Sequence, residues 1–517
     1  MKTTLYKPVI VLLFASFFYS CEDILNTELK GSYTTESFFV SQDNAVLAVN
    51  AAYRPLSFAT DGAEIWVVGD TRSDDAVKGG DAGDKADAAD IDNFTENTNN
   101  GVVATIWANY YEGITRCNYA IVNIGAMGSD IINADLKSRL IGEAKFLRAY
   151  YYFLLTNIYG DIPVLLTPKL ASELQIAPSA VSDVYKQIEK DCADARDALP
   201  VDYATNEVGR ATKGAAIALL AKSYLYQGKW KDAYETALLL TQAPFTYQLM
   251  PDYQYNFNVN YENNAESIFE IQHLSGQNPF SGNLLNQAFA APADYGMGEG
   301  YYFNQPTQNF VDEFETVDIA GTIYTDPRLD YSIGRENAQL PWIDDTITYS
   351  SSWTETGYIA KKMLQPISEI PGNIKGDGDL NYTAIRYADV LLWIAEAYNE
   401  DGNSATALIY LNQVRKRARE SFQVDPNLYN YPNIPAGLLA DITDTDPTTL
   451  RAKIRHERRT ELGFEFHRYF DIMRYGEEYA NTIFKDVENF SYKENRYLPY
   501  PQRELDTNYE LRNYTKN

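Results

Sequence analysis

The sequence HERRT at 456–460 is the part of this chain that most resembles a catalytic motif. A zinc protease of the HExxH type needs two histidines four positions apart, so that both imidazoles bind the metal from one helix face. Here Thr460 occupies the second position, and the other histidines are His273 and His467. Because one imidazole does not hold a catalytic zinc ion, the pattern argues against a metalloprotease.

Motifs for a nucleophile or for phosphate binding are missing as well. No G-x-S-x-G sequence occurs, and GGDAGDK at 79–85 lacks both the spacing and the following Ser or Thr of a phosphate-binding loop. A glycosidase needs a pair of carboxylates, but Asp and Glu are too numerous here to single out a pair. We therefore expect no catalytic residues and no enzyme activity, with a glycoside hydrolase kept as an alternative.

Charged residues between positions 458 and 474 are spaced for ion pairing. Opposite charges three or four residues apart on a helix are neighbours, and they can also reach an adjacent helix. The residues with this spacing are Arg458, Glu461, Glu465, Arg468, Asp471 and Arg474. The pattern predicts a structural ion-pair network.

Aromatic residues in polar loops are the main candidates for ligand binding. The chain has 41 Tyr, and its aromatic share of 14% is high even for a protein with a large core. A ring can cover the apolar face of a sugar at little entropy cost, while polar neighbours orient the hydroxyl groups. We expect at least two of the rings to form a binding platform. The ring candidates are Trp342, Trp353, Tyr295, Tyr301, Tyr302, Trp66 and Phe94, and the polar candidates are Asp70, Asp74, Asn93 and Asn97.

Two acidic loops are weak candidates for a structural calcium ion. Segments 69–94 and 376–379 are rich in Asp and Gly, but the regular Asp spacing of an EF-hand is absent. A solvated loop is the simpler interpretation, so we expect no cofactor and keep calcium as an alternative. Its ligands would be Asp81, Asp84, Asp377 and Asp379.

The helices that must position these loops are visible as apolar residues recurring every three or four positions. In EAKFLRAYYYFLLTNIYGDIP (143–163), the wide apolar face predicts rings packed inside a helix stack, and Gly160 followed by Pro163 predicts its end. Ser182 is a predicted N-cap. The predicted helical segments are 105–124, 143–159, 179–199, 211–226, 387–398 and 450–476.

Two distant segments repeat each other, AKSYLYQGKWKDA (221–233) and AEAYNEDGNSATA (395–407). Ala, Tyr, Gly and Ala stand at the same relative positions in both. Small residues let two helices approach closely, and Gly can close the first helix in the left-handed conformation. The repeat predicts helix pairs of the tetratricopeptide type that are scattered along the chain.

The region between Thr246 and Asn381 lacks helical periodicity. Pro, Gly, Asn, Asp and aromatic residues dominate it, with short strand-like runs only. Long irregular segments in compact proteins usually carry function. We therefore expect the ligand surface in this region or near the loop at 58–100.

Net charge and the N-terminal segment bear on partners and location. The formal charge of −27 repels polyanions, which argues against nucleic acids and against sulfated or uronic-acid ligands.

An apolar run at 9–18 is too short to span a bilayer, and with Ser20 and Cys21 it predicts a signal peptide over 1–20 and lipidation of Cys21. Cys117 and Cys192 are expected to be buried thiols, although a disulfide stays open.

Several segments, in their order along the chain, resemble the SusD/RagB family of surface lipoproteins. They are WANYYEGITRCN (107–118), EAKFLRAYYYFLLTNIYGDIP (143–163), GRATKGAAIALLAKSYLYQGKWKDA (209–233), DPRLD (326–330), IRYADVLLWIAEAYNEDG (385–402) with ALIYLNQVRKRA (407–418), RHERRTELGFEFHRYFDIMRYG (455–476) and YLPYPQRELDTN (497–508). No single segment is specific for the family, but the shared order of the segments over nearly the whole mature chain is specific for it.

The resemblance implies a mainly α fold, in which four tetratricopeptide-like helix pairs pack against an irregular, loop-rich ligand-binding half with short strands. It implies a single domain over 21–517, with a tether at 21–40, a helical scaffold at 41–245 and 381–517, and a binding insertion at 246–380.

The implied function is that of a lipid-anchored glycan-binding protein at the outer-membrane surface. Such a protein captures neutral oligosaccharides or polysaccharide and delivers them to a SusC-like, TonB-dependent transporter, on which it acts as a lid. A peptide-binding lid of the RagB kind is the alternative within the family.

Overall fold

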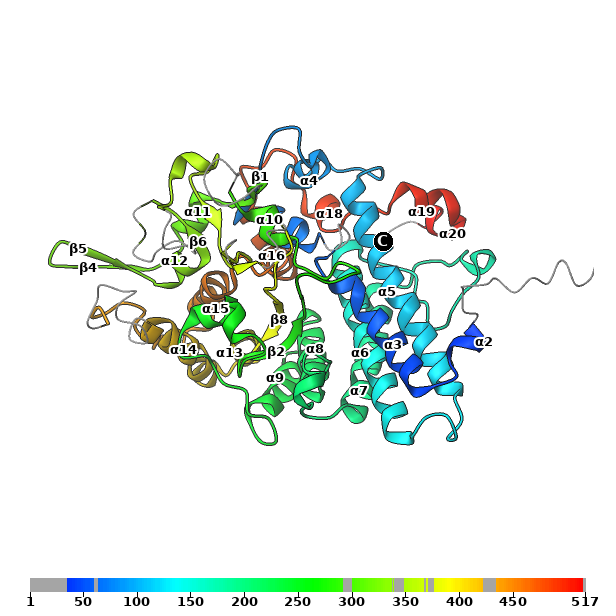
Figure 1. Ribbon diagram of the computed structural model, residues 1–517. Coiled ribbons are helices and arrows are strands. Elements are labelled where there is room, and N and C mark those ends of the chain that lie inside the picture. The colour runs from blue at the N-terminus through cyan, green and yellow to red at the C-terminus, as the bar shows by residue number, and fades with distance from the viewer. Residues whose placement is uncertain are drawn as a thin grey trace, which may run out of the picture.

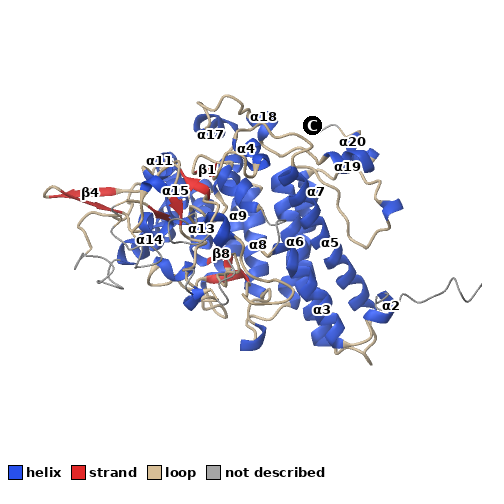
Figure 2. Cartoon of the chain, turned by 45° about the horizontal axis from the view of Figure 1, so that its top comes forward, coloured by secondary structure: helices blue, strands red, loops and turns tan. Residues whose placement is uncertain are grey.

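The computed structural model describes residues 35–59, 64–291, 300–336, 338, 348–366, 369–370, 376–421 and 434–514. The long helices between residues 42 and 198 lie side by side on one side of the molecule, and the strands lie on the other side together with the helices between residues 387 and 462 (Figure 1). Figure 2 shows the same division.

The helical side is a continuous stack in which each long helix contacts the next. Side-chain oxygens of Asn100, Asn133 and Thr212 cap three of these helices by accepting backbone N–H groups of their first turns. The stacked helices are α3 (Gln42–Tyr53), α5 (Gly101–Ala126), α6 (Ala134–Tyr159), α7 (Val181–Ala198), α8 (Lys213–Tyr226), α9 (Trp230–Leu238), α13 (Tyr387–Glu400), α14 (Ser404–Glu420) and α15 (Pro447–Leu462).

Helix α6 lies inside this stack, as its aromatic face predicts. Tyr151, Tyr152 and Tyr159 are completely buried. Their hydroxyl groups donate to the backbone carbonyls of Ala52 (2.7 Å), Leu165 (2.7 Å) and Val103 (2.6 Å) respectively. Each ring therefore contributes apolar area to the core, while its polar tip ties a neighbouring segment to α6.

The two predicted helix pairs are confirmed as α8 with α9 and α13 with α14. Gly228 and Gly402 end the first helix of each pair with φ angles of 67° and 85°, which is the left-handed conformation expected of them. Helix α9 also packs against α13, so the two pairs are neighbours in space although they are distant in sequence.

Two local predictions are wrong. Ser182 lies within the first turn of α7, whose N-cap is Ala180, and Asp161 accepts the N–H of Val181 at 2.8 Å. The predicted helix at 450–476 is two helices, α15 and α16 (Arg468–Arg474), because the chain turns at Gly463. A Cβ at Gly463 would lie 2.4 Å from the Phe310 ring, so tertiary packing selects glycine there.

Between positions 246 and 381, no described helix is longer than five residues, and the described strands form two-stranded antiparallel pairs. The pairs are β1 (Ala76–Gly79) with β3 (Phe303–Pro306), β2 (Ser267–Ile271) with β8 (Tyr382–Arg386), β4 (Thr316–Ile319) with β5 (Thr322–Thr325), and β6 (Ile333–Gly334) with β7 (Ile359–Ala360). The pairing of β1 with β3 brings the acidic loop beside residues 300–306. The β4–β5 hairpin projects from the body (Figures 1 and 2).

The remaining described helices are short. They are α2 (Thr35–Phe38), α4 (Ala86–Asp92), α10 (Leu285–Phe289), α11 (Gln308–Val311), α12 (Arg328–Ser332), α17 (Glu477–Ile483), α18 (Tyr492–Asn495), α19 (Gln502–Thr507) and α20 (Tyr509–Arg512). No helix in the described ranges is both long and apolar enough to cross a bilayer. Cys117 and Cys192 are buried free thiols, as expected.

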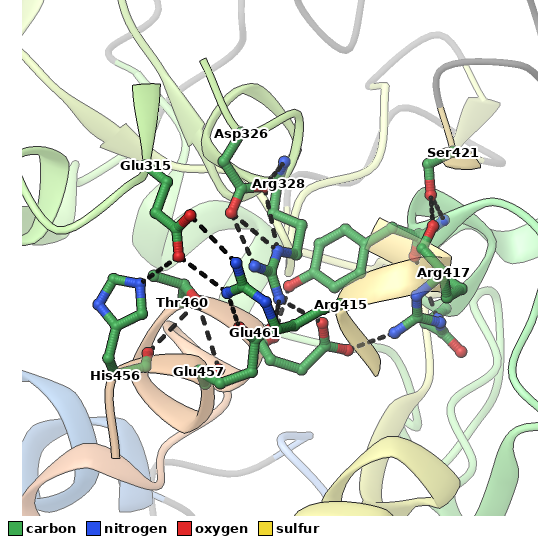
Figure 3. Close-up of polar contacts among 12 residues, drawn as sticks. Glu315, Asp326, Arg328, Arg415, Arg417, Ser421, His456, Glu457, Thr460 and Glu461 are labelled. Atoms are coloured by element: carbon green, nitrogen blue, oxygen red, sulfur yellow. Dashed lines mark hydrogen bonds and ion pairs between the residues drawn. The ribbon is translucent and has the colours of Figure 1, made fainter. Parts of the chain in front are cut away.

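The predicted ion-pair network is confirmed, and it lies in the interior (Figure 3). Glu461 of α15 accepts from Arg328 (2.9 Å), Arg386 (2.6 Å) and Arg417. Arg458 forms an ion pair with Asp389 of α13. The ion-pair partners of the α15 residues thus come mostly from elements that are distant in sequence. The network joins α15 to α12, α13, α14 and β8.

Candidate functional site

A surface pocket of about 410 Å³ lies where β3, α10 and the residues before α4 meet. We call it the ring pocket. Its size suits a small ligand such as one or two sugar units. It is lined by Phe58, Glu64, Trp66, Asp84, Lys85, Leu284, Leu285, Gln287, Ala288, Tyr301 and Phe303.

Three aromatic rings form a stack at the wall of the ring pocket. The Tyr301 and Phe303 rings are nearly parallel, with centroids 5.5 Å apart and an interplanar angle of 9°. Phe303 stacks in turn on Trp66, at 6.0 Å and 15°. Tyr301 is 48% exposed, whereas Trp66 and Phe303 are each 2% exposed. The outer ring therefore presents a face to solvent, and the two buried rings hold it in place.

The backbone at Tyr301 and Tyr302 is hydrogen-bonded to α10 and to the residue after it. The N–H of Tyr301 donates to the carbonyl of Gln287, and that of Tyr302 donates to the carbonyl of Ala290, both at 3.0 Å. A Cβ at Gly300 would lie 1.9 Å from the Ala290 carbonyl oxygen, so only glycine permits this approach. The position of the Tyr301 ring is thus set by the backbone as well as by stacking.

Charged groups also line the ring pocket. Lys85 forms an ion pair with the buried carboxylate of Glu64, and Asp84 beside it is exposed. Nearby, the Tyr302 hydroxyl donates to Asp81 at 2.6 Å. The described lining residues therefore include two carboxylates and one ammonium group in addition to the rings.

The structure brings together several of the predicted residues. Trp66, Tyr301 and Asp84 line the ring pocket, and Tyr302 and Asp81 lie next to it. Because Trp66 is buried, it supports the platform and is not the ring that a ligand would cover. Phe303, Gln287, Glu64 and Lys85 were missed, since no local pattern distinguishes them from ordinary loop residues.

Trp353 is half-buried and packs edge-to-face on Tyr349, with ring centroids 5.1 Å apart. Its segment is joined to β3, because Gln305 accepts the N–H of Thr356 at 3.2 Å and donates to the Tyr302 carbonyl at 2.9 Å. Trp353 does not line the ring pocket. Two other predicted rings, Trp342 and Tyr295, lie outside the described residues.

Phe94 is a core residue, contrary to its prediction as a platform ring. It is 6% exposed, and its ring centroid lies 5.1 Å from those of both Phe484 and Phe490. The Arg72 guanidinium covers the ring at 4.7 Å. No ring face is left for a ligand, because residues from the distant C-terminal region cover it.

Asp70 and Asp74 are structural groups, which corrects their prediction as ligand contacts. Asp70 is 1% exposed and accepts from Asn304 and from the N–H of Phe466, both at 3.1 Å. Its burial raises its pKa to about 8. Asp74 accepts two hydrogen bonds from Arg468 at 2.7 and 2.9 Å. Burial acts to raise the pKa of Asp74, but Arg468 and Arg459 outweigh it and lower the pKa.

Asn93 and Asn97 are exposed but lie outside the ring pocket. Asn93 follows the last residue of α4 and donates to the carbonyl of Ala89 at 2.7 Å. The Asn97 side chain accepts the N–H of Asn99 at 2.9 Å. Both side chains serve local turns.

The acidic loops contain no metal-binding cluster within the described ranges, where no three His, Cys, Asp or Glu side chains are grouped to hold an ion. Lys78 donates to the backbone carbonyls of Asp81 (2.8 Å) and Asp84 (2.9 Å). Its ammonium group therefore occupies the position that a metal ion bound by these carbonyls would take. Asp377 accepts the N–H of Gly276 at 2.7 Å. Asp379 similarly accepts the N–H of Ser275 at 2.7 Å.

The helical scaffold thus carries a ring-lined surface pocket. The model of the SusD family matches residues 265–517, and a model described as starch-binding associating with outer membrane matches residues 69–225. SusD-like protein P2 of Formosa agariphila is 29% identical over 526 residues, covering 98% of each chain.

Solved structures agree with these matches. A SusD superfamily protein from Bacteroides vulgatus has a TM-score of 0.76 at 26% identity, covering 92% of this chain and 98% of that one. A laminarin-binding SusD-like protein has a TM-score of 0.73 at 26% identity, covering 90% and 98% respectively. The chain belongs to the SusD/RagB family and has the mainly helical fold of that family.

Proposed function

We propose that this protein captures neutral oligosaccharides in the ring pocket, at the cell surface, and delivers them to a SusC-like, TonB-dependent outer-membrane transporter on which it acts as a lid. The observation that carries the proposal is the exposed Tyr301 ring, which is backed by two buried rings in a pocket that polar residues also line. A sugar can lie with its apolar face on such a ring while its hydroxyl groups bind polar groups of the lining. The laminarin-binding relative supports this ligand class.

The charges of the ring pocket favour a neutral ligand. Among the described lining residues, Glu64 and Asp84 are the carboxylates and Lys85 is the cation. Lys85 is already paired with Glu64, which leaves the charge of Asp84 uncompensated within the lining. An acidic sugar placed on Tyr301 would be repelled by that charge.

We propose binding without bond cleavage. A glycosidase needs two carboxyl groups about 5 to 9 Å apart that both face the scissile bond. Glu64 is buried and ion-paired, so among the described lining residues of the ring pocket Asp84 is the one carboxylate that faces solvent. This supports a carbohydrate-binding protein over a glycoside hydrolase.

The proposed location is the outer membrane, with lipid at Cys21 after removal of residues 1–20. The family description that mentions the outer membrane supports this location. Cys21 lies outside the described residues. Several acyl chains would be needed, because a single chain anchors a protein only marginally.

The test is calorimetric titration of the chain from Glu22 onward with neutral and acidic oligosaccharides, starting with laminarin fragments. Tyr301→Ala should weaken binding of the neutral ligand about tenfold or more, because the stacking surface is lost. Tyr509→Ala is the matched control: Tyr509 is also 48% exposed but lies in α20, outside the pocket.

Equal affinities of the Tyr301→Ala variant and the wild type would overturn the site. Binding of oligopeptides in place of every sugar would favour the peptide-binding alternative. New reducing ends after incubation would show that the protein is an enzyme.

A further inference from the structure

A second surface pocket of about 410 Å³ lies among the helix ends of the scaffold and shares no lining residue with the ring pocket. We call it the arginine pocket. It is formed by the last residues of α6 and α8, the first turn of α7, helix α16 and the chain after α18. It is lined by Asn157, Val181, Ser182, Tyr185, Tyr226, Gln227, Phe470, Met473, Arg474, Arg496 and Tyr497.

The charge of the arginine pocket is opposite to that of the chain as a whole. The full sequence has 71 acidic residues against 44 basic ones. The lining of this pocket, in contrast, contains two arginines and no Asp or Glu. The charged residues of this lining are therefore all basic, in contrast to those of the chain as a whole.

Arg474 is fully engaged in the protein. Its guanidinium donates to Glu396 at 2.7 Å and to Asp471 at 2.8 Å, and it packs over the Tyr226 ring at 5.2 Å. Its charge is therefore compensated, and its role is to hold one wall of the pocket.

Arg496 is different, because no carboxylate of the described residues forms an ion pair with it. Its guanidinium lies 5.5 Å from the centroid of the Tyr492 ring and 5.0 Å from that of Tyr497. Ring contacts orient a guanidinium but do not replace a carboxylate, so its N–H groups remain able to bind an anion through two parallel hydrogen bonds.

The other walls are mostly apolar, and several of their polar groups are hydrogen-bonded within the protein. The Tyr185 hydroxyl donates to Asn157 at 3.0 Å, and Gln227 donates to Glu189 at 2.7 Å. Asp161 is the nearby carboxylate that could compete for Arg496. It accepts instead from the N–H of Val181 and from the Tyr514 hydroxyl, both at 2.8 Å.

We propose that the arginine pocket binds a carboxylate-bearing sugar unit, a uronate, with Arg496 holding the carboxylate and the tyrosine rings covering the sugar. The choice of a sugar over another carboxylate rests on the proposed function. The acidity of the whole chain does not prevent this, because charges farther than about 8 Å are largely screened at physiological salt. The protein would thus hold a neutral segment in one pocket and an acidic unit in the other.

The test uses the chain from Glu22 onward, which contains every described residue, and follows binding by saturation-transfer NMR titration. The probes are glucuronic acid, its uncharged amide glucuronamide, and N-acetylphenylalanine as a carboxylate without a sugar. Glucuronic acid should bind at least about tenfold more tightly than glucuronamide, since a hydrogen-bonded charge pair is lost in the amide.

Arg496→Gln should remove this preference, and Arg496→Lys should keep part of it, because lysine retains the charge but lacks the planar fork. Arg512→Gln removes the same charge from an exposed position outside the pocket and should bind like the wild type. An unchanged melting temperature in Arg496→Gln shows that the loss is local.

Equal binding of glucuronic acid and glucuronamide, an unaffected Arg496→Gln variant, or no binding at all would overturn the proposal. Tighter binding of N-acetylphenylalanine than of glucuronic acid would overturn the choice of a sugar. Failure of the ring pocket is distinguishable, because neutral laminarin fragments would then not bind while glucuronic acid still does.

Discussion

At the scale of single residues, His456 shows how a motif acquires a different role in the folded chain. Its two ring nitrogens contact the carboxylates of Glu313 (2.8 Å) and Glu315 (3.4 Å), which lie at the base of the β4–β5 hairpin. Burial lowers the pKa of His456, but hydrogen bonds to these carboxylates outweigh it and raise the pKa to about 9. The residue is therefore a cation at neutral pH and holds an acidic segment.

This arrangement makes part of the stability pH-dependent. Because the pKa of His456 is higher in the folded state than its ordinary value of 6.5, its contribution is complete below pH 6.5 and is lost as the pH rises through about 9. His456→Gln should thus lower the free energy of unfolding by about 2–3 kcal/mol at pH 6 and much less at pH 10. Urea unfolding of both proteins at the two pH values checks this. A difference in unfolding free energy between the two proteins that is the same at both pH values would contradict the prediction.

At the scale of elements, the turns of the helix pairs depend on backbone conformation. Gly402 joins α13 to α14 with a φ angle of 85°, and a Cβ there would meet nothing within 4 Å. Any cost of a side chain at this position therefore comes from the left-handed backbone and not from a clash.

Gly402→Ala should lower the free energy of unfolding by about 1–2 kcal/mol, because alanine avoids the left-handed conformation. Gly125→Ala is the control, since Gly125 lies within α5 at ordinary helical angles and a Cβ there also meets nothing within 4 Å. That variant should be unchanged or more stable by about 0.5 kcal/mol. Thermal unfolding of the two variants checks this. Equal shifts of their melting temperatures from that of the wild type would contradict the prediction.

At the scale of the whole molecule, the buried ion-pair network connects the helical scaffold with the loop-rich half. Burial alone would raise the pKa of Glu461, but Arg417, Arg386 and Arg328 hold it well below its ordinary value. Arg386 is the last residue of β8 and Arg328 is the first residue of α12, so both halves of the fold supply charges to the network. The halves should consequently unfold together.

Glu461→Gln should destabilise the protein by about 3–5 kcal/mol, because it leaves buried arginines without their carboxylate. Glu235→Gln removes a carboxylate from the exposed pair with Lys231 and should cost no more than about 1 kcal/mol. Calorimetric unfolding would check both, and similar costs for the two variants would contradict a structural role for the network.

The sequence alone was sufficient for the features that depend on short-range pattern. Helical periodicity predicted the burial of the α6 rings, and the repeated Ala, Tyr, Gly and Ala positions predicted two helix pairs with left-handed glycines. The ordered segments predicted the family. These features follow from residues a few positions apart, whose spacing on a helix is set by local geometry.

Only the tertiary structure decided which loop residues are available to a ligand. Asp74 is paired with Arg468, 394 positions away, and Phe94 is covered by Phe484 and Phe490. Tyr301 also lies in a polar loop, as Asp74 and Phe94 do, yet its side chain stays exposed. An Asp or an aromatic residue in a polar loop is suited equally to packing and to binding, and its exposure is set by chain segments that come together only when the protein folds.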